Sequence, residues 1–372
     1  MGDYYGWDIG GVHLKLSRLV CGVGKASIRT RIVPFEIWRD PAGLGRRLRD
    51  LFTNGKGQAG AAAGERAGPP MGGARRRSTQ GMHGVTMTAE LSDVFASRAD
   101  GARSILQACA EALPGPPSVL DLNGDLVPFR VALERPMEVA AANWAATARL
   151  VARLRRDAVL VDVGSTTTDI IPIRRGRACP SGRTDTERLL SGELVYSGFL
   201  RTPPASLAES VPLRGGWCRV SPEQFTVMGD VHLILGSIGA RDYTTTTPDG
   251  RGRSLREAMA RLARLVCGDV REIGAAALRT IARHLADRQV EQLAGAMRQV
   301  LDDQGASRST GAIAAGAGAF LGEAAARRAG LSVTRLERLL PFVDGAGWDK
   351  AAPSAALAVF MAENEGEFRF TH

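Results

Sequence analysis

Residues 159–173 read Val-Leu-Val-Asp-Val-Gly-Ser-Thr-Thr-Thr-Asp-Ile-Ile-Pro-Ile and form the most informative segment of the chain. An apolar strand runs into Asp162, a glycine and four hydroxyl residues, then meets Asp169 and returns to an apolar strand. A glycine turn lined with hydroxyl donors can hold phosphate oxygens. A carboxylate at each end suits a hydrated magnesium ion. Taken alone, the pattern fits an ordinary hairpin with a polar turn equally well.

The same order of strand, Asp and glycine turn occurs at residues 4–16, where Asp8 precedes Gly10 and Gly11. Paired Asp-Gly hairpins, about half a chain apart, resemble the actin-like ATPase, sugar kinase and Hsp70 superfold. In that superfold, two related α/β domains each contribute one hairpin to a phosphate site. The expected fold is therefore α/β, with two domains of this type.

Length and composition agree with two globular domains. A chain of 372 residues exceeds one typical core, and its 44% hydrophobic and 23% charged residues are ordinary values. No apolar run is long enough to span a bilayer, and the N-terminus lacks the pattern of a secretory signal. Five dispersed cysteines form no Cys-x-x-Cys pair. These features predict a cytoplasmic protein with free thiols and no membrane partner.

The net charge of +9 comes almost entirely from arginine, because only four of the 48 basic residues are lysine. This skew indicates a GC-rich genome rather than a selected basic patch. Aromatic residues make up only 5% of the chain, and no basic stripe interleaved with aromatic residues is present. We therefore expect no nucleic-acid partner, although a basic protein attracts anionic small substrates.

Composition also divides the chain. Residues 54–80 are mainly Gly, Ala, Pro and Arg, which cannot repay the entropy of ordering, so we predict a mobile surface insertion there. An Ala-rich helix expected over 137–154 leads directly into the second hairpin. The first domain is therefore predicted to span 1–155 and the second 156–372.

Apolar spacing predicts the remaining elements. Helices are expected at 41–52, 101–113, 254–267 and 275–303, strands at 26–35, 84–88, 231–236 and 310–315, and a hairpin at 118–129. The last of these strands ends in a Gly316-Ala317-Gly318 turn before a helix, where backbone amides can approach a phosphate. Close packing of the helix explains these two glycines equally well.

Taken together, the motifs resemble the hydantoinase/oxoprolinase-related proteins of tetrahydromethanopterin-linked one-carbon transfer, whose archaeal relatives act in methanofuran biosynthesis. The resemblance extends over roughly residues 5–325, which makes it specific as a set. The chain departs from the family at the insertion and at Val12-His13, where small or polar residues usually follow the two glycines. The segments that carry the resemblance are 6–11, 85–93, 141–144, 161–173, 192–198, 201–203, 229–236 and 261–267.

This resemblance implies a transferase that joins an aminomethylfuran-methyl diphosphate to the phenol of a (glutamyl)tyramine, forming an ether and releasing diphosphate. It implies a requirement for Mg²⁺ and none for ATP. The expected metal ligands are Asp8, Asp162 and Asp169. The expected diphosphate-binding residues are Gly10, Gly11, Lys15, Gly164, Ser165, Thr166, Thr167, Arg201, Gly316 and Gly318.

Glu90 is the candidate base that takes the proton of the attacking phenol, and Asp8 and Asp162 complete the catalytic set. Glu90 follows a short strand, at the edge where α/β sheets bind their ligands. Capping of the next helix is an equally weighted role for Glu90, and surface salt bridges are the alternative for Lys15 and Arg201. His232 is expected to be a core histidine.

Two other classes of function stay open. One is an ATP-dependent enzyme, either a small-molecule kinase or a hydantoinase/oxoprolinase-type enzyme; the other is a non-catalytic nucleotide sensor. The transferase predicts release of pyrophosphate without ATP, whereas the second class predicts consumption of ATP. The expected partners are a small diphosphate and a phenolic amine, and a homodimer is compatible with the sequence.

Overall fold

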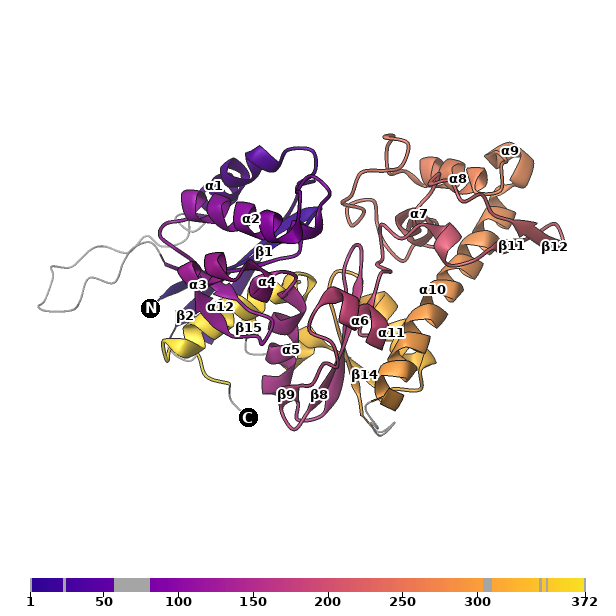
Figure 1. Cartoon of the computed structure of the whole chain (residues 1–372). Coiled ribbons are helices and arrows are strands. Elements are labelled where there is room, and N and C mark those ends of the chain that lie inside the picture. Colours follow the sequence, from indigo (N-terminus) through magenta and orange to yellow (C-terminus); the bar gives the residue numbers. More distant parts are fainter. Residues whose placement is uncertain are drawn as a thin grey trace, which may run out of the picture. The chain divides into compact units, whose positions relative to one another are not determined.

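The computed structural model describes residues 2–22, 25–56, 81–303, 310–340, 343–345 and 347–370. The chain divides into two compact units, one comprising Met1–Leu150 and Leu340–His372, the other Val151–Leu339 (Figure 1). Most of the insertion predicted at 54–80 lies outside the described residues. None of the described helices is long and apolar enough to cross a membrane.

Unit 1 is built on a seven-stranded sheet with the strand order β15-β3-β2-β1-β4-β5-β6. β1 pairs antiparallel with β2 and parallel with β4, so β1 and β4 end side by side at the same edge of the sheet. The strands are β1 (Asp3–Ile9), β2 (His13–Gly22), β3 (Lys25–Pro34), β4 (Met82–Met87), β5 (Ser118–Leu120), β6 (Leu126–Pro128) and β15 (Val343–Asp344).

The helices of unit 1 bury an apolar face against this sheet. Trp7 of β1, Leu48 of α1 and Ile105 of α2 belong to one hydrophobic cluster, and none of the three is exposed to solvent. The helices are α1 (Leu44–Lys56), α2 (Arg98–Ala112), α3 (Phe129–Glu134), α4 (Pro136–Val139), α5 (Asn143–Leu154), whose residues after Leu150 belong to unit 2, and α12 (Ala352–Asn364), with the short 3₁₀ turns η1 (Pro41–Gly43), η2 (Ala89–Leu91) and η5 (Trp348–Ala351).

The C-terminal helix α12 belongs to unit 1, which corrects the assignment of all residues after 155 to a second domain. α12 contacts β1, β2 and β4 (Figure 1), and every residue from Ala352 to Ala362 is buried. A helix that is apolar on all sides needs cover on all sides, which the sheet of unit 1 helps to provide. The hydroxyls of Ser17 and Ser354 lie 2.7 Å apart across this contact.

The close approach of α12 requires a glycine in β1. A Cβ atom added to Gly6 would lie 1.8 Å from the carbonyl oxygen of Ser354. We expect Gly6→Ala to lower the free energy of unfolding by about 1–3 kcal/mol, because the added methyl group overpacks this contact. Thermal denaturation of the purified variant measures the change. In the matched control Gly45→Ala, the added Cβ approaches no atom closer than 3.6 Å, so the first turn of α1 gains an alanine and stability should rise slightly. Equal stability of Gly6→Ala and the wild type would contradict the packing described here.

Unit 2 contains a six-stranded sheet in which β10-β8-β7-β13-β14 follow one another and β9 pairs with β8. β7 pairs antiparallel with β8 and parallel with β13. The strands are β7 (Ala158–Val163), β8 (Thr168–Arg174), β9 (Arg177–Ala178), β10 (Leu194–Val195), β13 (Ala312–Ala315) and β14 (Val333–Arg335), and β11 (Ser210–Leu213) and β12 (Gly216–Arg219) form a separate hairpin.

The helices of unit 2 are centred on the 29-residue α10. It contacts α7, α8, α11 and the strand β8. The helices are α6 (Asp185–Ser191), α7 (Met228–Ile234), α8 (Leu255–Arg264), α9 (Val270–Ile273), α10 (Ala275–Asp303) and α11 (Ala319–Arg328), with the 3₁₀ turns η3 (Pro204–Ser206) and η4 (Leu336–Leu339).

Most of the predicted elements are confirmed. The helices expected at 41–52, 101–113, 254–267 and 275–303 are α1, α2, α8 and α10, and the strands expected at 26–35, 84–88 and 310–315 are β3, β4 and β13. The hairpin expected at 118–129 is formed by β5 and β6.

Two predicted elements were wrong in type or length. Residues 231–236 form no strand: residues 231–234 belong to α7, and Leu235 and Gly236 form the turn after it. Val231 and Ile234 of α7 pack with Leu262 of α8. A short apolar run does not distinguish a buried strand from one turn of a buried helix. The helix expected over 137–154 is interrupted between α4 and α5, because Ala141 adopts a left-handed backbone with φ of 53°.

Candidate functional site

The two Asp-Gly hairpins have the same turn geometry. The amide of Gly10 donates to the carbonyl oxygen of His13 at 3.0 Å, and the amide of Gly164 donates to that of Thr167 at 2.9 Å. The unusual His13 therefore leaves the hydrogen bond of the first turn unchanged. The residues opposite the two aspartates differ, because Asp8 faces Lys15 and Asp162 faces Asp169.

The turn of the second hairpin, Gly164–Thr167, exposes a set of donors that the protein itself does not use. Among the hydrogen bonds of the described residues, the amides and hydroxyls of Ser165, Thr166 and Thr167 have no acceptor. All four residues of the turn are half-buried. Uncommitted amide and hydroxyl donors on one turn can bind an anion. We call this turn the anion loop.

Residues 198–201, which follow β10, pack against the backbone of the anion loop. The amide of Phe199 donates to the carbonyl of Gly164 at 3.1 Å, and the amide of Arg201 donates to that of Ser165 at 2.9 Å. A Cβ atom added to Gly198 would lie 2.5 Å from both the Ser165 carbonyl carbon and the Thr166 nitrogen. The predicted residue Arg201 thus reaches the loop through its backbone, while its side chain is exposed.

Asp162, the next-to-last residue of β7, lies beside the first of the two predicted glycines. It is 8% exposed, and a Cβ atom on Gly316, whose φ is +85°, would lie 2.4 Å from Asp162 Oδ1. Gly316 therefore leaves room for this carboxylate. The amide of Gly318 donates to the carbonyl of Val163 at 2.9 Å, so close packing of the turn already uses the donor that the sequence assigned to a phosphate.

Asp169 has a partner inside unit 2. Its carboxylate forms a buried ion pair with Arg188 of α6, which is 1% exposed. Arg188 also lies 3.4 Å from Asp185. The described residues contain no group of three or more His, Cys, Asp or Glu side chains that could hold a metal ion. A magnesium ion at Asp162 would consequently take most of its ligands from water and substrate, as Mg²⁺ commonly does.

In unit 1, the carboxylate of Asp8 is only partly satisfied. Asp8 is 1% exposed, and its Oδ2 accepts a hydrogen bond from Lys15 Nζ at 2.8 Å. Its Oδ1 and the hydroxyl of Thr86, which faces Asp8 in the β1–β4 ladder, have no hydrogen-bond partner within the described part of the chain. Unsatisfied buried polar atoms are costly, so this pair fits a water, hydrated ion or ligand donor.

Glu90 lies in η2, directly after β4, where the sequence placed the base. It is 1% exposed, and its Oε1 accepts from Arg98 Nη2 of α2 at 3.1 Å. The N-cap of η2 is Thr88, which makes no side-chain capping bond. Glu90 is thus a buried, ion-paired carboxylate at the carboxyl end of the sheet, and not a residue on the surface.

A match to a family model shows to which protein family the chain belongs. Residues 81–358 match the model of the hydantoinase/oxoprolinase family. The chain belongs to this family. Its fold is that of the actin-like ATPase, sugar kinase and Hsp70 superfold, as the paired hairpins predicted.

Two curated relatives of this hydantoinase/oxoprolinase family chain carry the name "(4-{4-[2-(gamma-L-glutamylamino)ethyl]phenoxymethyl}furan-2-yl)methanamine synthase". The protein from Methanocaldococcus jannaschii is 40% identical over 186 residues, which are 50% of this chain and 56% of that protein. The protein from Methanococcus vannielii is 42% identical over 120 residues, which are 32% of this chain and 54% of that protein. The chain spans about half the length of these relatives.

A solved structure extends the comparison to the fold. Nucleotide-free acetone carboxylase, an enzyme of ATP-dependent acetone carboxylation, superposes with a TM-score of 0.55 over 96% of this chain and 70% of its own. The two sequences are 10% identical, so this similarity shows a shared fold and no shared activity.

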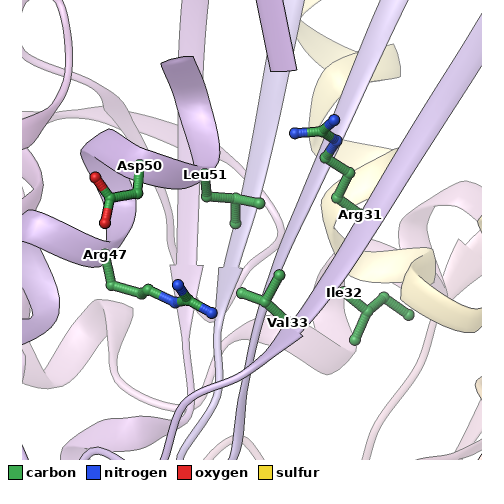
Figure 2. A pocket seen from close by; sticks show the side chains of 6 residues that line it. All are labelled: Arg31, Ile32, Val33, Arg47, Asp50 and Leu51. Carbon is green, nitrogen blue, oxygen red and sulfur yellow. The ribbon is translucent and has the colours of Figure 1, made fainter. Parts of the chain in front are cut away.

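A pocket of about 380 Å³ lies apart from the predicted residues of this family member. α1 and β3 form it, and the Arg47 guanidinium extends toward Val33 while the Asp50 carboxylate points away from it (Figure 2). None of its lining residues was predicted as a site residue. The lining consists of Arg31, Ile32, Val33, Arg47, Asp50 and Leu51.

Three residues that contact the predicted site were missed in the sequence. Thr86 faces Asp8, Arg98 pairs with Glu90, and Gln289 bonds to the segment behind the anion loop. Thr86 could have been found from the strand alternation, since it lies two residues before the end of a predicted strand at Thr88. Gln289 lies in an otherwise apolar stripe of α10, which is the only signal that it carries.

Proposed function

We propose that the chain acts as a transferase of methanofuran-type cofactor biosynthesis. It would join an aminomethylfuran-methyl diphosphate to the phenol of a (glutamyl)tyramine and release diphosphate. The names of the two relatives support this role, since an ether between a furan methylene and a phenol is part of the compound in those names. The observation that carries the proposal is the anion loop, whose donors are free for a diphosphate.

The proposed reaction exchanges one carbon–oxygen bond for another. The bond between the furfuryl methylene carbon and the diphosphate oxygen breaks, and the diphosphate leaves with the electron pair. A phenol oxygen forms the new bond to that carbon, and the phenol proton passes to a carboxylate. The furan oxygen stabilises the positive charge that develops on the carbon, so the protein mainly has to stabilise the leaving group.

Each residue of the site has a proposed part in this reaction. The amides and hydroxyls of Ser165, Thr166 and Thr167 would bind the departing diphosphate oxygens. Asp162 fits a hydrated magnesium ion next to the anion loop. In unit 1, the unsatisfied oxygen of Asp8 fits a hydrated ion or a ligand donor. When bound, magnesium would compensate the negative charge of the diphosphate. Glu90 is the proposed base.

Direct assay tests this proposal. Purified protein is incubated with magnesium, the aminomethylfuran diphosphate and tyramine-type acceptors, and pyrophosphate and the ether are quantified by mass spectrometry. We expect ether and pyrophosphate in equal amounts without ATP. Product that forms only when ATP is added, or consumption of ATP without ether, would replace the transferase by an ATP-dependent enzyme of the same fold. Absence of product with every acceptor would overturn the proposal.

Replacement of Glu90 tests its role as base. We expect Glu90→Gln to lower kcat for ether formation by about 10²-fold, because the amide cannot accept the phenol proton. The steady-state rate of pyrophosphate release measures the loss. The control Glu134→Gln removes a carboxylate from an exposed ion pair with Arg130 and should leave kcat unchanged. Full activity of Glu90→Gln, or equal loss in both variants, would remove Glu90 from the mechanism.

A further inference from the structure

A buried glutamine on α10 bonds to the backbone behind the anion loop. Gln289 has no exposed surface. Its Nε2 donates to the Ser197 hydroxyl at 3.1 Å and to the Gly198 carbonyl at 2.9 Å. Its Oε1 lies 2.9 Å from Nε2 of His232. All hydrogen-bonding groups on the end of this side chain except one lone pair are therefore used.

His232 fixes the orientation of the Gln289 amide. Burial lowers the pKa of His232 to about 4, so the imidazole is neutral at physiological pH. Because both hydrogens of the Gln289 amide are directed to Ser197 and Gly198, its oxygen must accept from His232 Nε2–H. Phe320 of α11 holds the imidazole ring in an edge-to-face contact with centroids 5.1 Å apart. The expected core position of His232 is thus confirmed, but the imidazole is only partly satisfied, because Nδ1 has no hydrogen-bond partner among the described residues.

Gln289 bonds to Ser197 and Gly198, and Gly198 packs against the anion loop. Gly198 packs directly against the backbone of Ser165 and Thr166. A Cβ atom added to Gly198 would lie 2.5 Å from both residues, so only glycine fits at this position. The Thr202 hydroxyl also bonds to Gly198, accepting from its amide at 2.8 Å and donating to its carbonyl at 2.9 Å. A shift at Gly198 would therefore be transmitted directly to the loop.

We infer that Gln289 is a positioning residue for diphosphate binding, since it fixes the Gly198 backbone against which the anion loop packs. The ligand class, a diphosphate, rests on the proposed function; the positioning itself rests on the contacts above. Gln289 lies 91 residues from Gly198 in the sequence. Its side-chain amide bonds to Ser197, Gly198 and His232, so it acts on the loop through the segment that contains Gly198.

The variant Gln289→Glu tests the inference with almost no change of size. A carboxylate replaces the two donors and faces the Gly198 carbonyl, which repels it. Two readouts follow: binding of inorganic pyrophosphate with magnesium by calorimetry, and hydrogen–deuterium exchange of the amides of Phe199 and Arg201. We expect pyrophosphate affinity to fall about tenfold and exchange of these amides to rise about tenfold. In the assay with the diphosphate donor, KM should rise more than kcat falls.

Leu285→Ala is the matched control for a general loss of stability. Leu285 lies on the same helix with no exposed surface, but it packs in a different cluster that includes Met228 and Leu262. We expect this variant to lose thermal stability while it retains pyrophosphate affinity and the exchange rates of Phe199 and Arg201. Equal changes in both variants at equal loss of Tm would overturn the positioning role, as would unchanged exchange in Gln289→Glu.

The two readouts separate this inference from the proposed function. Exchange at Phe199 and Arg201 needs no ligand, so it decides the positioning role even for a protein that binds no pyrophosphate. Lack of pyrophosphate binding by the wild type would instead overturn the diphosphate part of the proposal. The conservative variant Ser197→Ala removes one of the two bonds from Gln289 and should give an intermediate rise in exchange.

Discussion

Replacement of Asp162 by asparagine is expected to lower kcat for ether formation by about 10³-fold while the protein stays folded. Asparagine has nearly the same shape, so the space that Gly316 leaves beside this side chain still accommodates it. The negative charge, however, is lost from the end of β7, next to the donors of the anion loop. Without that charge, a magnesium ion would no longer be held near the departing diphosphate.

The experiment compares Asp162→Asn with Asp157→Asn. Asp157 directly precedes β7, whereas Asp162 is the next-to-last residue of that strand. Asp157 is exposed and accepts a hydrogen bond from the amide of Arg175 at 3.1 Å. We expect Asp157→Asn to retain wild-type kcat. Pyrophosphate release at saturating donor is measured over a series of magnesium concentrations, and circular dichroism verifies folding. An Asp162→Asn variant with wild-type turnover would remove Asp162 from the proposed metal and diphosphate site.

The hairpins could be predicted from the sequence because their signals are local. Strand alternation, a glycine turn and a short loop set the register within a few residues, and the structure shows the same turn bond at Gly10 and Gly164. The apolar periodicity of α10 was similarly sufficient to place a long helix. Local patterns of this kind do not depend on distant partners.

The residues that complete the site depend on tertiary contacts that no local pattern encodes. Lys15 looked like a phosphate ligand, but the β1–β2 register places its ammonium on Asp8. Asp169 looked like a metal ligand, but α6 brings Arg188 onto it. In both cases the sequence shows a charge and not the partner that compensates it. The metal and diphosphate roles of these residues stay predictions.

The same limit explains the two misplaced segments. α12 is apolar on all sides, which predicts burial but does not say in which unit, and its place against β1 is fixed by a glycine more than 340 residues away. The apolar run at α7 was equally ambiguous. The sequence also gives no sign that Asp230 pairs with Arg261, which lies 31 residues later.

Breaking the buried ion pair between Asp230 and Arg261 is expected to have the largest effect on stability. Asp230 and Arg261 have fully buried side chains and are joined by three hydrogen bonds of 2.6–3.0 Å. Burial lowers the pKa of Arg261, but the bonds and charge of Asp230 outweigh it and raise that pKa above its usual value, so the guanidinium stays charged. We expect Arg261→Met to lower the free energy of unfolding by about 3–5 kcal/mol, because Asp230 is left as an uncompensated buried charge.

Chemical denaturation of Arg261→Met and Arg264→Met measures this difference. Arg264 lies on the same helix, but its side chain is 42% exposed and its distance to Asp249 is 3.8 Å, so its loss should cost less than about 1 kcal/mol. The double variant Arg261→Met with Asp230→Leu removes both buried charges and should recover much of the lost stability. If the double variant is no more stable than Arg261→Met, the loss comes from packing and from the bonds of Arg261 to Asp249 and Gly252, not from the stranded carboxylate.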